Sequence, residues 1–321
     1  MKILIIGGTS FVGRHFVTAA VMRMNSKTQT YRILSLTFLL LSSISVAAQG
    51  IDRDKIVAQL ETQRCVDLEE RKLKVCKFDY EADGRNIEAI AIFPIAPGKY
   101  PGLLLLPGFE GTAKTMLGMG SFFAGQGFAC LGVTPPGFGK SEGKRDFMGP
   151  DSIDAFATGF RKFRREPYVD STRMGIFGYS RGAMAASLLA PKLGGEVKAA
   201  VFGAGVYDFK RAYDDTKLDG IRENMKAETG MTETAINERS SILHMQRLKC
   251  PVLILHGEND ANAPTSQAFL LRDRLAELKK EFEFKILPDH VHGQIKGDFL
   301  TLVLDFLNRK LKGASNTPKL A

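Results

Sequence analysis

Cysteine is scarce in this sequence, with four residues in 321. Cys65 and Cys76 lie close together and flank a charged turn, so in an oxidising compartment they are placed to form a disulfide. Cys130 and Cys250 stand in or beside strand-like apolar runs, where we expect buried free thiols. No spacing among the four resembles a zinc or haem site. We therefore expect neither a metal nor a cofactor.

Acidic residues are absent before Asp52, whereas residues 1–50 contain five lysines and arginines. These five account for much of the formal net charge of +9. The remaining charge is spread along the chain rather than gathered in blocks. This distribution indicates a solvated mixed surface and argues against a nucleic-acid partner. With 44% hydrophobic and 25% charged residues, the composition is that of an ordinary globular protein.

Residues 24–48 have the three parts of a secretory signal peptide. Lys27 and Arg32 precede an apolar run over residues 33–41, and small residues at 45–48 offer a cleavage site. The run is too short to span a bilayer comfortably, and no cysteine at the cleavage site suggests a lipid anchor. We expect a secreted or periplasmic protein without a stable membrane anchor. A buried core strand or helix is the alternative interpretation.

Residues 1–21 begin with a strand-like apolar run, followed by a glycine-rich turn and a helical pattern. The glycines of the turn are Gly7, Gly8 and Gly13. This segment resembles the start of an NAD-dependent epimerase of the extended short-chain dehydrogenase family. A dinucleotide site also needs an acid about 20 residues further on, and none occurs before Asp52. Ser10 replaces the middle glycine of the family pattern. We therefore expect residues 1–23 to be a non-functional fragment or the product of a misplaced start.

The body of the chain alternates strand-like and helical patterns. Two early strands, 72–80 and 86–93, are joined by a turn at 82–84. Short apolar runs of the buried parallel type follow at 102–106, 128–133, 173–177, 197–203, 251–256 and 281–287. Helical patterns lie between them at 114–126, 151–166, 181–193, 264–280 and 297–312. This alternation predicts a mainly parallel sheet with helices on both faces.

The sequence predicts one large domain over residues 49–312. A helical, polar insert at 208–247 interrupts the alternation, and we expect it to form a small cap over the strand ends. Residues 313–321 are predicted to form a flexible tail. In a parallel α/β sheet the ligand site lies at the carboxyl ends of the strands. The cap is therefore expected to shape that site.

Ser180 is the candidate nucleophile. It is the central residue of Gly178-Tyr179-Ser180-Arg181-Gly182, which follows the strand-like run 173–177 and opens a helical pattern. A strand followed by G-x-S-x-G and a helix is the context of a nucleophile elbow. Serine needs a base to accept its proton, and the base needs an orienting acid. Both should follow Ser180 in the chain.

Two later loops supply candidates for these roles. The first, after the strand-like run 251–256, carries Glu258 and Asp260. The second carries His290 and His292. The residue pattern alone leaves both acids and both histidines open. Two further histidines are weaker candidates, because His256 stands at a strand end and His244 lies in the cap with no motif around it.

With these motifs, residues 71–312 resemble an α/β-hydrolase of the prolyl oligopeptidase and dienelactone hydrolase-like branch. The similar segments are His-Gly-Glu-Asn-Asp-x-x-x-Pro at 256–264, Pro-Asp-x-x-His-Gly at 288–293 and Pro-Gly-Phe-Gly-Lys-Ser-Glu-Gly at 136–143. The resemblance implies the α/β-hydrolase fold, with a mainly parallel central sheet covered by helices on both faces. It also implies that Asp260 is the acid and His292 the base.

An oxyanion hole completes the predicted site. One donor is the backbone N–H of Arg181, directly after the nucleophile. The resemblance places the second at the backbone N–H of Phe109, although this chain has Pro107-Gly108 where relatives usually have His-Gly. Arg181 itself departs from the family pattern. Its side chain either selects anionic acyl groups or points into solvent, and the sequence leaves both open.

These residues predict a serine hydrolase that cleaves carboxylic esters, a carboxylesterase (EC 3.1.1), through an acyl-enzyme on Ser180. Its partner would be a small-molecule ester. Peptide hydrolysis of the prolyl oligopeptidase type is the alternative. It is disfavoured here because those relatives usually carry a large propeller domain. A non-catalytic binding protein on a hydrolase scaffold is a third possibility. The sequence does not predict an oligomeric state.

Overall fold

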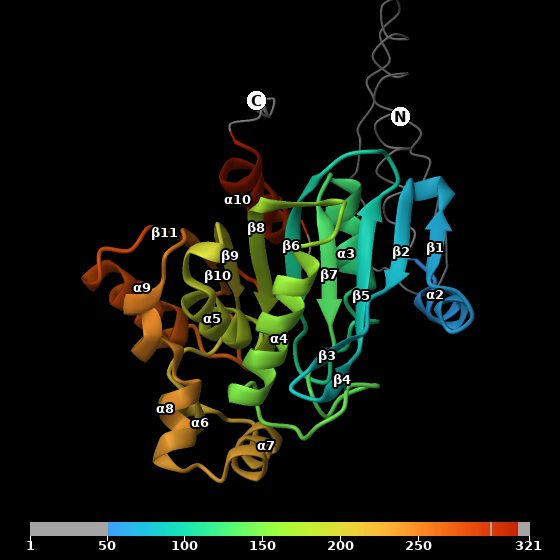
Figure 1. Ribbon diagram of the computed structural model, residues 1–321. Coiled ribbons are helices and arrows are strands. Elements are labelled where there is room, and N and C mark those ends of the chain that lie inside the picture. The colour runs from blue at the N-terminus through green and yellow to red at the C-terminus, as the bar shows by residue number, and fades with distance from the viewer. Residues whose placement is uncertain (1–50, 296, 314–321) are drawn as a thin grey trace, which may run out of the picture. The chain divides into compact units, whose positions relative to one another are not determined.

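The structure is a computed structural model, which describes residues 51–295 and 297–313 (Figure 1). The predicted epimerase-like fragment at 1–23 and signal peptide at 24–48 lie outside the described residues. Nearly all of the predicted tail at 313–321 also lies outside them.

Within the described residues, nine strands form one sheet in the spatial order β1-β2-β5-β7-β6-β8-β9-β10-β11. The strands are β1 (Cys65–Leu68), β2 (Leu73–Lys77), β5 (Ala89–Pro94), β6 (Tyr100–Leu106), β7 (Ala129–Val133), β8 (Val169–Tyr179), β9 (Ala199–Gly203), β10 (Val252–Gly257) and β11 (Phe282–Leu287). All pairs from β7 to β11 in this order are parallel. The pairs among β1, β2, β5 and β7 are antiparallel. The predicted α/β-hydrolase fold is confirmed.

Helices cover both faces of the sheet (Figure 1). They are α2 (Arg53–Leu60), α3 (Leu117–Gly125), α4 (Pro150–Phe163), α5 (Arg181–Leu193), α9 (Ser266–Glu277) and α10 (Asp298–Leu307), the last continued by a π-helical turn at Asn308–Lys312. The core forms two clusters, one on each face. One contains Phe156 of α4 and Leu189 of α5, and the other contains Phe123 of α3 and Phe306 of α10.

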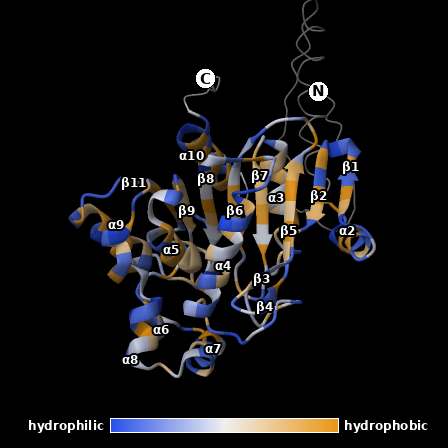
Figure 2. Ribbon diagram, viewed as in Figure 1, coloured by the Kyte–Doolittle hydropathy of each residue, from blue (hydrophilic) through white to orange (hydrophobic). Residues whose placement is uncertain are grey.

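The strands of the sheet are hydrophobic along most of their length (Figure 2). Strand β6 is a clear case, since Leu103 to Leu106 are all buried. A strand buried on both faces reads as a continuous apolar run, which explains why the parallel strands were recognisable in the sequence. Among the described helices, none is both long and apolar enough to cross a membrane.

The insert at 208–247 is helical, as predicted. It contains α6 (Phe209–Asp215), α7 (Asp219–Thr229), α8 (Glu233–Arg239) and a 3-10 turn at Ser241–Arg247. Figure 1 shows α6, α7 and α8 beyond the carboxyl ends of the parallel strands. The cap therefore lies at the end of the sheet where a ligand site is expected.

The early part of the domain differs from the prediction. The single strand predicted at 72–80 ends at Lys77, and Tyr80–Ala82 (β3) pairs instead with Arg85–Ile87 (β4) in a separate two-stranded sheet. The cause lies at Asp79, whose carboxylate accepts a hydrogen bond from Ala89 N at 3.0 Å. This side chain takes the place of a backbone acceptor, so the β2–β5 ladder stops there. The turn predicted at 82–84 is confirmed. The sequence analysis missed α2 and β1.

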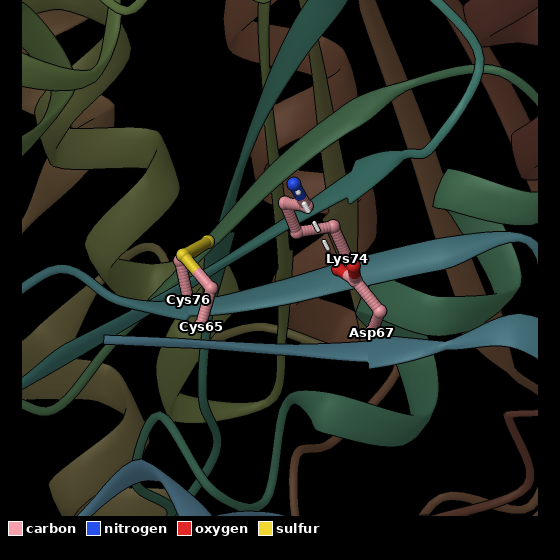
Figure 3. The surroundings of a disulfide bond; sticks show 4 residues. All are labelled: Cys65, Asp67, Lys74 and Cys76. Carbon is pink, nitrogen blue, oxygen red and sulfur yellow. Dashed lines mark ion pairs between the residues drawn. A yellow bond between two sulfur atoms is a disulfide. The ribbon is translucent and has the colours of Figure 1, made fainter. Parts of the chain in front are cut away.

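Cys65 and Cys76 form the disulfide that their spacing suggested (Figure 3). They are directly opposite each other in the antiparallel β1–β2 pair. Two residues further along this pair, the Asp67 carboxylate and the Lys74 ammonium lie 3.8 Å apart. The bond therefore crosslinks a strand at the edge of the sheet to its neighbour. Cys130 and Cys250 are free and buried, as expected.

Candidate active site

Ser180 lies in the tight turn between β8 and α5, as the motif predicted. Its backbone has φ 57° and ψ −124°, a strained conformation for a residue with a side chain. A Cβ at Gly178 would lie 2.0 Å from the Gly182 carbonyl oxygen, and one at Gly182 would lie 2.1 Å from the Leu106 carbonyl oxygen. Backbone atoms cannot move aside easily, so the turn requires glycine at both positions.

The structure brings Ser180, His292 and Asp260 together. The Ser180 hydroxyl donates a hydrogen bond to His292 Nε2, with 2.8 Å between Oγ and Nε2. On the other side of the ring, His292 Nδ1 donates to Asp260 Oδ2 at 2.7 Å. The Asp260 side chain is 1% exposed and that of His292 is 17% exposed. A continuous hydrogen-bonded path therefore leads from a buried carboxylate to a hydroxyl at the cavity wall.

Asp260 is held by the loop after β10. Its Oδ1 accepts backbone hydrogen bonds from Asn262 N at 3.0 Å and Ala263 N at 2.8 Å, which leaves Oδ2 for His292. Gly257 ends β10, and a Cβ there would lie 2.4 Å from the His290 carbonyl oxygen. This glycine lets the loop with the acid pass close to the loop with the histidine.

The rival candidates from these loops take no part in the hydrogen-bonded path. Glu258 is exposed. His290 faces its own loop, with Nδ1 2.9 Å from the Pro288 carbonyl oxygen. His244, the histidine of the cap, has its Nε2 atom 3.2 Å from the Asn237 carbonyl oxygen. The choice of Asp260 and His292 suggested by the family resemblance agrees with this geometry.

His256 is buried beneath the acid. Its Nε2 donates to the Ala263 carbonyl oxygen at 2.7 Å and lies 3.6 Å from Asp260 Oδ2. Burial lowers the pKa of His256, and the nearby Asp260 carboxylate opposes this shift only in part. The ring is therefore neutral near pH 7. It fastens the same loop that presents Asp260, so His256 is a packed residue at the end of its strand rather than a member of the hydrogen-bonded path.

Tyr179 is a site residue that the sequence analysis missed. Its hydroxyl oxygen accepts a hydrogen bond from Gly293 N at 2.7 Å, and its ring centroid lies 5.4 Å from that of His292. Burial raises the pKa of Tyr179 to about 12, so the phenol stays protonated. Tyr179 thus ties the residue before the nucleophile to the loop of the base. Its partner is a backbone group far along the chain, which no local pattern could reveal.

The residues of the two predicted oxyanion donors, Phe109 and Arg181, line the same cavity as Ser180. Arg181 is the first residue of α5, where backbone N–H groups have no intrahelical acceptor. Phe109 lies in the loop after β6. Among the described residues, no backbone acceptor pairs with the N–H of either. Ala113 N donates to Thr134 Oγ1 at 2.8 Å, which fastens the end of the Phe109 loop to the neighbouring strand end.

A cavity of about 560 Å³ adjoins these groups. Ser180 and His292 lie in its wall, and the cap contributes Ile221 and Met225 from α7. Most other lining residues are apolar and include Leu106, Phe109, Met116, Met119, Phe147, Phe177, Met184, Val206, Leu218 and Ile295. Another hollow of about 800 Å³, between α2, β2 and α4, contains none of the catalytic candidates. The 560 Å³ cavity is therefore the candidate substrate site.

The side chain of Arg181 does not point into solvent, so that alternative from the sequence is wrong. The side chain is 5% exposed and lies in the wall of the cavity. Burial lowers the pKa of Arg181, and the Glu228 carboxylate opposes this shift. Within residues 51–295 and 297–313, no cluster of His, Cys, Asp and Glu side chains is arranged to hold a metal ion.

A model of the prolyl oligopeptidase family matches residues 121–314, which include Ser180, Asp260 and His292. The chain belongs to the prolyl oligopeptidase family. It is a serine hydrolase. The uncharacterized peptidase YtmA of Bacillus subtilis is 32% identical over 209 residues, which cover 64% of this chain and 80% of the relative. Dipeptidyl-peptidase 5 of Porphyromonas endodontalis is 24% identical over 298 residues, covering 86% of this chain and 40% of the relative.

Solved structures share the fold. The acylaminoacyl peptidase of Pyrococcus horikoshii superposes with a TM-score of 0.66 at 20% identity, over 77% of this chain and 43% of that protein. The acetyl xylan esterase of Paenibacillus sp. R4 gives a TM-score of 0.64 at 17% identity, over 81% of this chain and 93% of the esterase. This chain thus spans less than half of the acylaminoacyl peptidase. The resemblance of residues 1–21 to an epimerase is not borne out by these comparisons.

Proposed function

We propose that this serine hydrolase is a peptidase that cleaves short peptides through an acyl-enzyme on Ser180. The observation that carries the proposal is the hydrogen-bonded path from Asp260 through His292 to Ser180 in the wall of an apolar cavity. Membership of the prolyl oligopeptidase family supports amide bonds as the substrate. The cavity volume of about 560 Å³ falls within the usual range of small-ligand sites, roughly 300–1,000 Å³.

The proposed first step forms the acyl-enzyme. Ser180 Oγ attacks the carbonyl carbon while His292 Nε2 accepts the hydroxyl proton. Asp260 accepts the Nδ1 proton of His292 in a hydrogen bond and stabilises the imidazolium that results. The carbonyl oxygen becomes an oxyanion, which the N–H groups of Phe109 and Arg181 would stabilise. The partial positive charge at the start of α5 adds to this stabilisation.

The intermediate then collapses and the enzyme is regenerated. The imidazolium donates its Nε2 proton to the leaving nitrogen, the C–N bond breaks, and the amine departs. A water molecule gives a proton to His292 as its oxygen attacks the acyl carbon. The C–O bond to Ser180 breaks, Oγ takes the proton back, and the acid leaves. The same groups perform both halves, so no further residue is required.

The sequence analysis favoured carboxylic esters, and a carboxylesterase is not confirmed. Its main argument was that relatives of the prolyl oligopeptidase type usually carry a large propeller domain. That argument is weakened by YtmA, a protein described as a peptidase of which this chain covers 80%. Peptidases and esterases of this kind share the acyl-enzyme, so they differ in which leaving group they expel. We therefore expect ester cleavage as a side activity.

The test uses substrate pairs with the same acyl group, one a para-nitroanilide and one a para-nitrophenyl ester. We expect the purified protein to hydrolyse both, and Ser180→Ala to lower kcat by on the order of 10⁴-fold or more. Ser187→Ala is the matched control, because Ser187 is a buried serine of the helix that follows Ser180, and its hydroxyl donates a hydrogen bond to the Met184 carbonyl.

The outcomes separate the alternatives. Hydrolysis of the esters but of no anilide contradicts the peptidase proposal and favours an esterase. A folded protein that turns over neither class, and whose Ser180 does not react with a fluorophosphonate, favours a non-catalytic binding protein. Turnover that survives Ser180→Ala would place the chemistry elsewhere.

A further inference from the structure

Arg181 places a buried positive charge beside the nucleophile. Its guanidinium carbon lies 3.9 Å from the ring centroid of Phe147 and 4.7 Å from that of Phe109. The ring of Phe138 is more distant, at 6.0 Å. Aromatic faces attract cations, but they do not replace the hydrogen bonds that a guanidinium loses on leaving water. A charge in this position needs a counter-ion.

Glu228 of the cap helix α7 is that counter-ion. Its Oε1 lies 3.6 Å from Arg181 Nη1, and its side chain is 9% exposed. Arg181 Nη1 is buried and has no hydrogen-bond partner among the described residues. Arg181 lines the cavity, whereas Glu228 does not. Of the two residues, Arg181 is therefore the one that belongs to the cavity wall.

Other charges near this pair face water. The guanidinium of Arg145 lies over the ring of Phe138, and its Nη1 is 4.0 Å from Glu110 Oε1. Both of these side chains are about half exposed, so solvent screens their effect on Arg181. Glu228 is buried and its charge is screened far less. The charge that the cavity presents therefore depends mainly on Glu228.

We propose that the Arg181–Glu228 pair sets the charge selectivity of the acyl site, so that the cavity accepts uncharged side chains and rejects acidic ones. This inference rests on the proposed function, because the cavity adjoins both proposed oxyanion donors and would receive the acyl part of the substrate. Arg181 without its counter-ion would attract a carboxylate on the substrate. Glu228 is thus a specificity-determining residue that never touches the substrate.

Glu228 has a second contact that governs the choice of variant. Its Oε2 accepts a hydrogen bond from Phe147 N at 2.8 Å. Phe147 and Met148 both have positive φ, and Arg239 of α8 donates to the Asp146 carbonyl of the same loop. Truncating Glu228 would release this strained loop. Glu228→Gln removes the charge but keeps an oxygen to accept the bond from Phe147 N.

The experiment compares peptide anilides that differ only in whether the residue before the cleaved bond is Glu or Gln. We expect the unaltered protein to prefer Gln. Glu228→Gln should raise the Glu-to-Gln ratio of kcat/KM by about ten- to a hundredfold, the range of a charge-assisted hydrogen bond. Glu238→Gln is the matched control, because Glu238 is a partly exposed cap acid that pairs with Arg239.

The double variant Arg181→Met, Glu228→Gln removes both charges of the pair. Replacing a buried ion pair by uncharged groups of similar volume is tolerated better than breaking it, so the double variant should fold and return the ratio to near that of the unaltered protein. An unchanged ratio in Glu228→Gln overturns the inference. A uniform loss of activity on both substrates overturns it too, since it shows only a structural contact.

Failure of the proposed function can be told apart from failure of this inference. Where anilides are not cleaved, the same ratio is measured on esters with the same acyl groups. Where nothing is cleaved, the proposed function fails, and calorimetry measures the binding of the two peptide acids instead. The inference then requires Glu228→Gln to tighten binding of the Glu peptide relative to the Gln peptide. Equal binding, or none, overturns it.

Discussion

At the scale of single residues, much of this site depends on backbone groups. The two proposed oxyanion donors are N–H groups, Asp260 is fixed by N–H groups of its own loop, and Tyr179 holds the His292 loop through Gly293 N. Side-chain substitutions leave such donors in place. Proline, which has no N–H, can remove one of them.

Phe109→Pro tests the second oxyanion donor. It removes the Phe109 N–H, and loss of one such donor typically lowers kcat by about 10²- to 10³-fold. Phe109→Ala is the control, because it keeps the N–H while removing the ring beside Arg181. Steady-state kinetics and the thermal midpoint of each variant are compared. Equal kcat for the proline and alanine variants, with both folded, would remove Phe109 from the oxyanion hole.

His256 should make the stability of the protein sensitive to acid. Burial lowers its pKa below the ordinary value of 6.5, so on acidification the unfolded chain takes up the proton first. The contribution of the neutral His256 ring to the free energy of unfolding is fully present above about pH 6.5. It is lost as the pH falls toward the lowered pKa of His256. His256→Gln keeps a donor for the Ala263 carbonyl but does not titrate.

Thermal unfolding from pH 8 to pH 5 measures this effect. We expect the midpoint of the unaltered protein to fall more steeply below pH 6.5 than that of His256→Gln. His244→Gln serves as the control, because this cap histidine is half-buried and lies outside the site. Parallel curves for His256→Gln and the unaltered protein would show that His256 does not carry the dependence.

At the scale of elements, the edge of the sheet depends on a crosslink. Among the described strands, the four-residue strand β1 pairs with β2 alone, and the Cys65–Cys76 disulfide joins the two across the sheet edge. A short edge strand contributes little burial, so a covalent bond that limits the unfolded chain has a large relative effect there.

Cys65→Ala with Cys76→Ala should lower the free energy of unfolding by about 2–4 kcal/mol, the usual range for a disulfide. Denaturant unfolding measures the loss. Reductant should lower the midpoint of the unaltered protein and leave that of the double variant unchanged. A reductant effect of equal size on both proteins would assign it to another cause, such as Cys130 or Cys250.

The elements also show how far the sequence could predict this fold. Ser180, Asp260 and His292 were found because each lies in a short motif after a buried strand, and local sequence determines such turns. Strand β1 was missed because only one of its four residues is buried. Glu228 was missed because its partner is brought near by the packing of the cap, and nothing in the polar sequence of α7 marks that contact.

At the scale of the whole molecule, the described fold and the candidate site occupy one segment. Both hydrophobic clusters and all proposed catalytic groups lie within residues 51–313. The residues before them carry the signal-peptide pattern, and we propose that the protein is exported to the periplasm or secreted. Export would also place Cys65 and Cys76 in an oxidising compartment.

A protein that begins at Gln49 should therefore keep the thermal midpoint and the kcat/KM of the longer chain. The physical reason is that the two core clusters and the catalytic groups described above consist of residues within 51–313. Expression of the full sequence in a secreting bacterium tests the export proposal, since cleavage of a signal peptide should yield a mature chain whose mass and first residue correspond to Gln49. Retention of the leader on an exported, folded protein would contradict the signal peptide, and loss of stability in the shortened chain would show that residues 1–48 belong to the domain.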